Sequence, residues 1–154
     1  MAFDTRKGTR GARQPRGRAL IWFNRLIMRR IRGGARFRRR QMLVLTTVGR
    51  KSGVPRQTPV TWFAGDGGGW IVVASAGGAA ANPAWFLNLA ARPEADVEVA
   101  GRTVPVVAEH LHGEERARVW ERIVREAPRF GGYQRKTDRE LPVVLLTERR
   151  GQPG

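Results

Sequence analysis

The stretch QMLVLTTVGRKSGVPRQTPVTWFA, residues 41–64, places a short basic turn between two segments typical of β-strands. Residues 41–48 are apolar and β-branched, and residues 56–64 combine Val, Thr, Trp and Phe with a proline, Pro59. Such residues favour strands, whereas a proline within a sheet is confined to an edge or a bulge. The turn, residues 49–53, begins and ends with glycine. We therefore predict two strands joined at this turn, the second at an edge or carrying a bulge.

Strand-like segments continue along the chain in an antiparallel order. Glycine-rich turns divide residues 56–76 and residues 95–111, which predicts two hairpins. Because helices do not alternate regularly with the strands, this order favours a small antiparallel β-barrel with helices outside it. The predicted strands are residues 41–48, 56–64, 70–76, 95–101, 102–111 and 141–148.

Three helices are predicted, near residues 18–32, 83–91 and 114–127. Asn82 is expected to cap the second of these and Pro83 to occupy its first position, because both residue types suit a helix start. The third helix should bury an apolar stripe. The stripe consists of Ala117, Trp120, Val124 and Ala127.

The positive charge of the chain is concentrated at its N-terminus. The net charge is +16 over 154 residues, and residues 1–40 hold 14 Lys and Arg against one acid, Asp4, which gives +13. A charged arm of this kind does not indicate a groove-reading surface, so nucleic acid is not the expected partner. A nucleic-acid binder driven by the arm is the rival hypothesis, and it predicts strongly salt-dependent DNA affinity.

Residues 1–17 are rich in Gly, Arg and Pro and are predicted to be a disordered basic tail. Residues 18–40 are predicted to form a basic amphipathic helix and a linker, followed by one domain over residues 41–150. The helix either packs on that domain or lies on an anionic membrane surface. The chain contains no apolar stretch of membrane-spanning length and no secretory signal, so we expect a cytoplasmic protein. The alternative is a peripheral protein at the inner face of the membrane.

Two kinds of catalytic chemistry are not expected. The chain contains no cysteine, which excludes disulfides, thiolate metal sites and a cysteine nucleophile. Its two histidines, His110 and His112, are not accompanied by a carboxylate cluster, and no metal site is predicted.

Two segments are candidates for binding an anionic, ring-bearing ligand. The basic turn offers Arg50, Lys51 and Ser52 between glycines, and Arg56 follows it. Such a turn is either an ordinary exposed hairpin turn or an anion-binding nest. Residues 74–85, ASAGGAAANPAW, lead from a strand through small residues into a helix start. This segment is either a plain connection or a shelf where a flat ligand approaches the backbone.

Four motifs resemble, in order and spacing, the deazaflavin-dependent nitroreductase family: LTTVGRKSGVPRQTPV, VVASAGGAAANPAWFLNL, DVEVAGR and YQRKTDRELPVVLLTE. The resemblance covers roughly residues 41–148. It implies an α+β fold, the six-stranded split β-barrel of FMN-binding proteins with flanking helices. It also implies the deazaflavin coenzyme F420 as cofactor, whose reduced form donates a hydride to quinones, nitroaromatics or other unsaturated acceptors. The alternatives are a split barrel that binds FMN, haem or a fatty acid.

The same resemblance implies roles for individual residues. Arg50, Lys51, Ser52 and Arg56 would hold the phosphate and acidic tail of the coenzyme. Ser75 or Tyr133 would orient or supply the proton that the acceptor needs, unless solvent does; the alternative for Tyr133 is an ordinary half-buried aromatic residue. The expected cofactor-binding residues are Arg50, Lys51, Ser52, Arg56, Gln57, Thr58, Pro59, Val60, Thr61, Val73, Ala74, Ser75, Ala76, Ala84, Trp85, Phe86, Leu87 and Asn88.

Three departures from that family's pattern change the expected site. Ala76 stands where a well-known relative has a lysine, and Ala127 and Phe130 stand where it has tyrosines. The acceptor pocket is therefore expected to differ from that of the relative.

Overall fold

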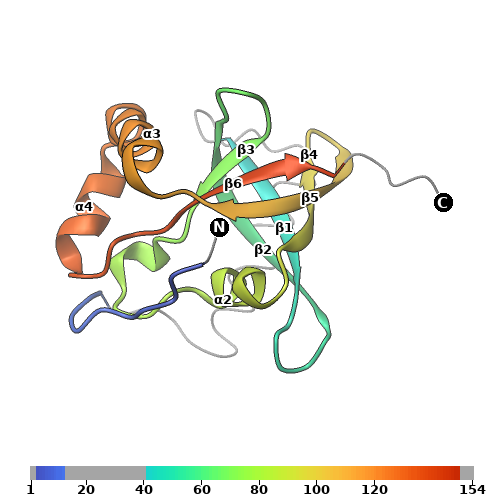
Figure 1. Ribbon diagram of the computed structural model, residues 1–154, viewed down its shortest axis with the longest axis horizontal. Coiled ribbons are helices and arrows are strands. Elements are labelled where there is room, and N and C mark those ends of the chain that lie inside the picture. Colours follow the sequence, from blue (N-terminus) through green and yellow to red (C-terminus); the bar gives the residue numbers. More distant parts are fainter. Residues whose placement is uncertain (1–2, 13–40, 150–154) are drawn as a thin grey trace.

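The computed structural model describes residues 3–12 and 41–149, and the remaining residues are drawn in grey (Figure 1). The predicted basic helix and linker, residues 18–40, lie outside the described part. No helix among the described residues is long and apolar enough to cross a membrane.

The body of the protein is a closed six-stranded antiparallel barrel with the strand order β1-β2-β3-β6-β5-β4 (Figure 1). The predicted barrel fold is confirmed, and both predicted hairpins are present as β2–β3 and β4–β5. The strands are β1 Met42–Val48, β2 Pro55–Ala64, β3 Trp70–Val73, β4 Glu94–Val99, β5 Arg102–His110 and β6 Val143–Glu148.

Strand β2 changes its partner half-way along its length. Residues 55–61 pair with β1, where Pro59 lies opposite Val44, and residues 62–64 pair with β3. Among the described strands, none pairs with the other side of β2 at Pro59. A proline is tolerated there because its missing N–H interrupts no ladder. The edge position predicted for Pro59 therefore agrees with the register.

Helices cover two different sides of the barrel (Figure 1). Helix α2, Ala84–Ala91, packs its Phe86 and Leu89 into the cluster of side chains inside the barrel. Helices α3, Gly113–Glu126, and α4, Arg129–Lys136, cover a second cluster on the outer face. A short 3-10 turn, Ala76–Gly78, connects β3 toward α2.

Helix α4 was not predicted, because its sequence RFGGYQRK contains two adjacent glycines that disfavour a helix. Tertiary packing overrides this preference: Phe130 lies 5.7 Å from the Phe63 ring of β2, centroid to centroid. The stripe predicted for α3 is correct in part. Trp120 and Ala127 pack in the outer cluster, but the buried residues within α3 are Val119 and Ile123, and Ala117 is exposed.

Residues 3–12, here called the N-terminal strap, lie in an extended conformation against the barrel domain. The disordered tail predicted for residues 1–17 is wrong over this range. Gly8 N–H donates to the carbonyl of Ala80 at 2.7 Å, and Thr9 N–H donates to Oδ1 of Asp138 at 2.8 Å. The strap is held mainly through its backbone, and for that reason its polar composition gave no sign of order.

The strap also contributes an aromatic side chain to the barrel core. Phe3 packs against Phe86 of α2 and His110 of β5, with ring centroids 5.5 and 5.7 Å apart. Docking therefore buries apolar surface as well as satisfying hydrogen bonds.

Candidate functional site

The candidate site begins where β2 and β3 separate. Strand β3 ends at Val73, and the next N–H, that of Ala74, donates to the carbonyl of Pro142 at 2.9 Å. This bond keeps the chain beside β6 while β2 diverges. Among the described residues, positions 57–61 of β2 consequently have no strand partner on that side. A free strand edge offers backbone donors and acceptors to a ligand.

The basic turn between β1 and β2 is closed by its own backbone. Gly49 N–H donates to Val54 O at 2.9 Å, and Gly53 N–H donates to Gly49 O at 2.8 Å. A Cβ on Gly49 would lie 2.6 Å from Ser52 Oγ and 3.6 Å from Arg56 Nε. The predicted phosphate ligands Ser52 and Arg56 therefore converge over a glycine that leaves them room.

Helix α2 holds this turn through one side chain. Asn88 Oδ1 accepts a hydrogen bond from Arg50 N–H at 3.1 Å, and Asn88 Nδ2 donates to Thr47 Oγ1 at 3.0 Å. Asn88 was predicted to contact the cofactor directly. In the structure it is buried and supports the turn from behind, while Arg50 and Lys51 are exposed.

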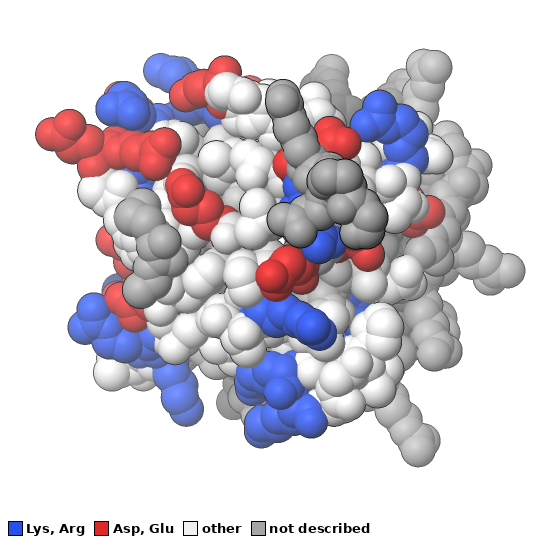
Figure 2. Space-filling view, turned by 45° about the vertical axis from the view of Figure 1, so that its right-hand side comes forward, with Lys and Arg blue, Asp and Glu red and all other residues white. Residues whose placement is uncertain are grey.

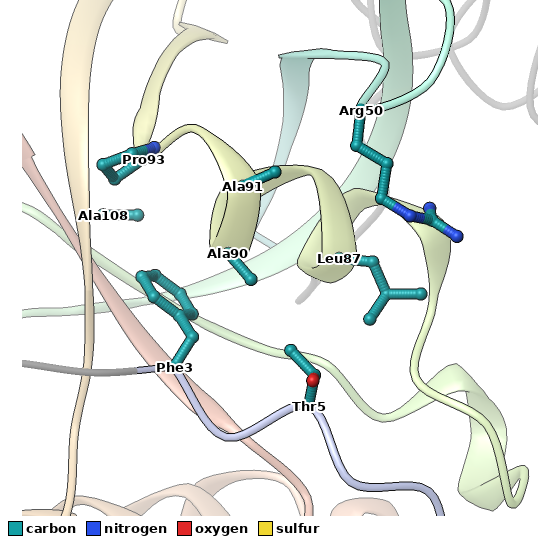
Figure 3. A pocket seen from close by; sticks show the side chains of 8 residues that line it. All are labelled: Phe3, Thr5, Arg50, Leu87, Ala90, Ala91, Pro93 and Ala108. Atoms are coloured by element: carbon teal, nitrogen blue, oxygen red, sulfur yellow. The ribbon is translucent and has the colours of Figure 1, made fainter.

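The Arg50 side chain lies near Leu87 of α2 and lines one side of a pocket of about 790 Å³ (Figure 3). The pocket is mostly apolar, with Arg50 as its cation, and the strap forms part of its wall. Sequence reasoning missed it because two of its residues come from the strap. Its lining residues are Phe3, Thr5, Arg50, Leu87, Ala90, Ala91, Pro93 and Ala108.

The loop after β3 forms a backbone nest. Ser75 has right-handed helical dihedrals (φ −78°, ψ −36°), and Ala76 and Gly77 follow with φ of 45° and 62°. Within the described residues, the N–H groups of these three positions have no hydrogen-bond acceptor. Such a succession of N–H groups binds anionic or carbonyl oxygens. The shelf predicted over residues 74–85 thus offers donors as well as small side chains.

Arg139, which sequence reasoning missed, lies directly behind this loop with 4% of its surface exposed. Its guanidinium donates to the carbonyls of Ala74 (2.9 Å), Ser75 (2.9 Å) and Ala79 (2.9 and 3.1 Å). No described carboxylate lies within ion-pair distance, and burial lowers the pKa of Arg139. Arg139 could not have been recognised as a buried arginine from the sequence, because no local pattern distinguishes it from the exposed arginines of the chain.

Asn82 is a hydrogen-bond partner of Arg139 and not the helix cap that the sequence predicted. It does not cap α2, whose N-cap position is occupied by Pro83. Its Oδ1 accepts from Arg139 Nη1 at 2.7 Å, and its Nδ2 donates to the carbonyl of Thr5 in the strap at 3.0 Å. Asn82 therefore links the strap to the buried arginine.

The predicted wall residues of α2 lie at different depths. Trp85 and Phe86 are 7% and 0% exposed and belong to the core inside the barrel. Leu87 lines the pocket, and Ala84 is exposed. Because the barrel interior takes the two aromatic rings, Leu87 and Ala84 are the side chains of this predicted set that remain available to a ligand.

Tyr133 lies in α4 and packs edge-on to Phe130, with ring centroids 5.5 Å apart. A Cβ on Gly78 would lie 2.5 Å from the Tyr133 carbonyl oxygen, so α4 and the 3-10 turn after Ser75 are in close contact. The two predicted catalytic residues are therefore carried by adjoining elements. Arg129, one turn before Tyr133, reaches Thr61 Oγ1 of β2 at 3.4 Å.

The two histidines form a pair at the end of β5. His110 Nδ1 accepts from Asp4 N–H at 3.2 Å, and its ring lies 4.2 Å from that of His112. Burial and then the neighbouring His112 lower the pKa of His110 to about 4. Within residues 3–12 and 41–149, no group of three or more imidazole and carboxylate side chains is placed to hold a metal ion.

Comparison with known proteins places this site in a family. Residues 22–148 match the family model described as F420H(2)-dependent quinone reductase. The chain belongs to the F420H2-dependent quinone reductase family. The resemblance to F420-dependent reductases is thereby confirmed, and the matched family is named for quinone reduction.

One relative of known family and two solved structures are similar to this chain in sequence. Rv1261c of Mycobacterium tuberculosis, an F420H2-dependent quinone reductase, is 40% identical over 111 residues, which is 70% of this chain and 73% of the relative. A solved F420H2-dependent reductase, FDR-A, is 36% identical with a TM-score of 0.63 over 70% of this chain and 95% of its own. A second solved structure, a domain-swapped dimer, is 32% identical with a TM-score of 0.64 over 82% and 95%.

Proposed function

We propose that this protein is an oxidoreductase that uses reduced coenzyme F420 to transfer a hydride to a quinone. Family membership supports the cofactor and the acceptor class. The observation in the structure that carries the proposal is that the N–H groups of Ser75–Gly77 and the edge of β2 at residues 57–61 have no partner among the described residues. A flat heterocycle with carbonyl oxygens at its edge matches both features.

The residues of the site fit the coenzyme in chemistry. The turn offers Arg50, Lys51 and Arg56 for a phosphate and an acidic tail, since guanidinium and ammonium groups bind such anions. When bound, the deazaflavin supplies the hydride. The chain's own contribution is to position the ring, exclude water and provide a proton. No cysteine or carboxylate nucleophile is required for this chemistry.

We propose the remaining cofactor ligands by the same resemblance. Thr58, Val60 and Trp85 face the barrel core, whereas Gln57, Pro59 and Thr61 lie on the opposite face of β2. This alternation favours the latter three as the ring-contacting side chains. Nitroaromatics and other unsaturated acceptors are further proposed substrates, and FMN is not needed as a cofactor.

Binding and turnover test the proposal directly. We expect fluorescence titration to show binding of F420, and anaerobic reduced F420 to be oxidised only when a soluble quinone such as menadione is added. A nitroaromatic added in place of the quinone measures the second acceptor class. Binding of FMN without binding of F420, or no quinone-dependent oxidation, would overturn the proposal.

Membrane docking through residues 18–40 is a separate proposal that rests on the sequence alone. The high positive charge of that segment would bind anionic lipid, in which long-chain quinones dissolve. Figure 2 shows acidic and basic side chains interspersed on one face of the described body, so the arm rather than this face is the expected contact. Flotation of the full chain with anionic vesicles, but not of a chain lacking residues 1–40, is the expected result.

Equal flotation of the two chains would reject membrane docking. If the full chain binds DNA and the chain lacking residues 1–40 does not, the nucleic-acid alternative is favoured.

A further inference from the structure

Arg139 is a buried cation whose hydrogen-bond partners among the described residues are all neutral groups. Five hydrogen bonds join its guanidinium to three backbone carbonyls and to Oδ1 of Asn82. Burying a charge without a partner of opposite sign is costly, and apolar residues often replace buried ions without loss of stability. A loop that only connected β3 to α2 would not need this cation. The buried charge of Arg139 therefore indicates that the loop has a function beyond connecting two elements.

The hydrogen bonds of Arg139 fix the direction of the adjacent N–H groups. The carbonyl of Ala74 shares a peptide group with the N–H of Ser75, and the carbonyl of Ser75 shares one with the N–H of Ala76. In a trans peptide the C=O and N–H point in opposite directions. Because Arg139 holds both carbonyls on its own side, both N–H groups point to the opposite side. These are two of the three free donors of the nest.

We infer that Arg139 is a positioning residue that aims the Ser75–Gly77 N–H groups at an anionic or carbonyl oxygen of the redox cofactor and favours the cofactor's hydride-carrying form. The inference rests on the proposed function for the identity of the ligand. The charge adds to the aligned peptide dipoles, since the carbonyl ends face the cation and the N–H ends face the site. A ring that has gained a hydride has gained a negative charge, which a fixed cation at low dielectric stabilises.

Two measurements on the full chain separate the geometric role from the electrostatic one. Hydrogen–deuterium exchange of residues 74–82 needs no cofactor and reports the order of the loop. The ratio of the dissociation constants for oxidised and reduced F420 reports how strongly the site prefers the hydride-carrying form. Arg139→Met removes charge and donors, whereas Arg139→Lys keeps the charge and reduces the donors. Arg116→Met is the control, because Arg116 is also largely buried but contacts Leu141 O and Glu140 instead of the carbonyls of residues 74–79.

We expect Arg139→Met to speed exchange in residues 74–82 and to lower the preference for reduced F420 about tenfold, which corresponds to about 30 mV for a two-electron couple. Arg139→Lys should speed exchange but retain most of the preference. Arg116→Met should change neither.

Unchanged exchange in both Arg139 variants would overturn the positioning role, and an unchanged preference in Arg139→Met would overturn the electrostatic role. If Arg139→Met does not fold, hydrogen–deuterium exchange in Arg139→Lys decides the positioning role. A decrease of more than about threefold in the preference of Arg139→Lys for reduced F420 would overturn the electrostatic role. Failure of the wild type to bind either form of F420 would instead refute the proposed function, and with it the cofactor part of the inference, while the exchange measurement would still decide the positioning role.

Discussion

Asn88 of α2 accepts a hydrogen bond from the backbone N–H of Arg50, 3.1 Å away, and its other end donates to Thr47 of β1. The amide thus joins the helix to the first strand and to the basic turn at one buried point. The turn that is proposed to bind phosphate is consequently held by a residue from a different element, and its backbone is fixed independently of its charged side chains.

Asn88→Ala should lower the free energy of unfolding by about 1–3 kcal/mol, because it leaves the buried Thr47 hydroxyl and the Arg50 N–H without their partner. Arg50→Ala is the control, since it retains the backbone N–H and should change stability by less than about 0.5 kcal/mol. Urea unfolding measures both variants. Equal stability of the two would show that the turn does not depend on Asn88.

Removing both cations of the turn should weaken cofactor binding without unfolding the protein. Arg50→Ala combined with Lys51→Ala is expected to cost several kcal/mol in F420 affinity, because charged hydrogen bonds contribute roughly 1.5–3 kcal/mol each. Arg118→Ala combined with Arg125→Ala removes the same charge from the exposed face of α3 and serves as the control. Fluorescence titration compares them. An affinity equal to that of the control pair would refute the phosphate assignment.

The strand pattern was predictable from the sequence because each strand carries its own local signal. The β-branched segment at residues 42–48 and the Ala100-Gly101 turn, with φ of 50° and 76°, are examples. The basic turn and the small-residue loop were found for the same reason. Long-range relationships had no such signal. The docking of Phe3 depends on Phe86 and His110, which lie far along the chain, and the burial of Arg139 depends on carbonyls from another segment.

One sequence prediction failed, and one helix was missed, where tertiary contacts override local preference. Asn82 has the side chain of a good N-cap, yet it binds Arg139 because a buried guanidinium needs acceptors. Helix α4 contains Gly131 and Gly132, yet it forms because Phe130 packs against the barrel. Local rules describe isolated segments, and these positions are decided by partners distant in sequence.

The stability of the strap should depend on pH through His110. The pKa of His110 is about 4 in the folded chain against an ordinary value of 6.5, with Asp4, His112 and Arg116 as the charged neighbours. The unfolded chain therefore binds a proton between pH 6.5 and 4 that the folded chain does not, and stability falls as the pH drops through this window. We expect roughly 2 kcal/mol less stability at pH 5 than at pH 7 from this residue.

His110→Gln isolates this contribution, because it retains an acceptor for Asp4 N–H and does not titrate. Chemical unfolding at pH 5 and pH 7 should show a smaller loss for the variant than for the wild type. The pKa of Asp4 is about 2, so its own effect appears below this window. An identical loss in both proteins would assign the pH dependence to other groups.

Gly78 should be the least replaceable glycine of the candidate site. Its φ of 87° disfavours any side chain, and an added Cβ would lie 2.5 Å from the Tyr133 carbonyl oxygen. Gly78→Ala is expected to destabilise the protein by about 2 kcal/mol or more, since the left-handed conformation alone costs 1–2 kcal/mol. Gly67→Ala, whose Cβ would meet nothing within 4 Å, is the control. Unfolding in urea compares them, and similar values would contradict the close packing of α4 on the loop.

Tyr133→Phe tests whether the tyrosine hydroxyl serves the acceptor. The ring is anchored by Phe130, and the hydroxyl has no hydrogen-bond partner within the described residues, although a half-buried tyrosine hydroxyl usually finds one. If the hydroxyl orients the acceptor or gives it a proton, kcat with a quinone should fall at least about tenfold, while F420 affinity and thermal stability stay unchanged. Steady-state kinetics with menadione measures the effect, with Ser75→Ala assayed in parallel as the second candidate donor. Wild-type kcat in Tyr133→Phe would leave packing as the role of Tyr133, and wild-type kcat in both variants would identify solvent as the proton source.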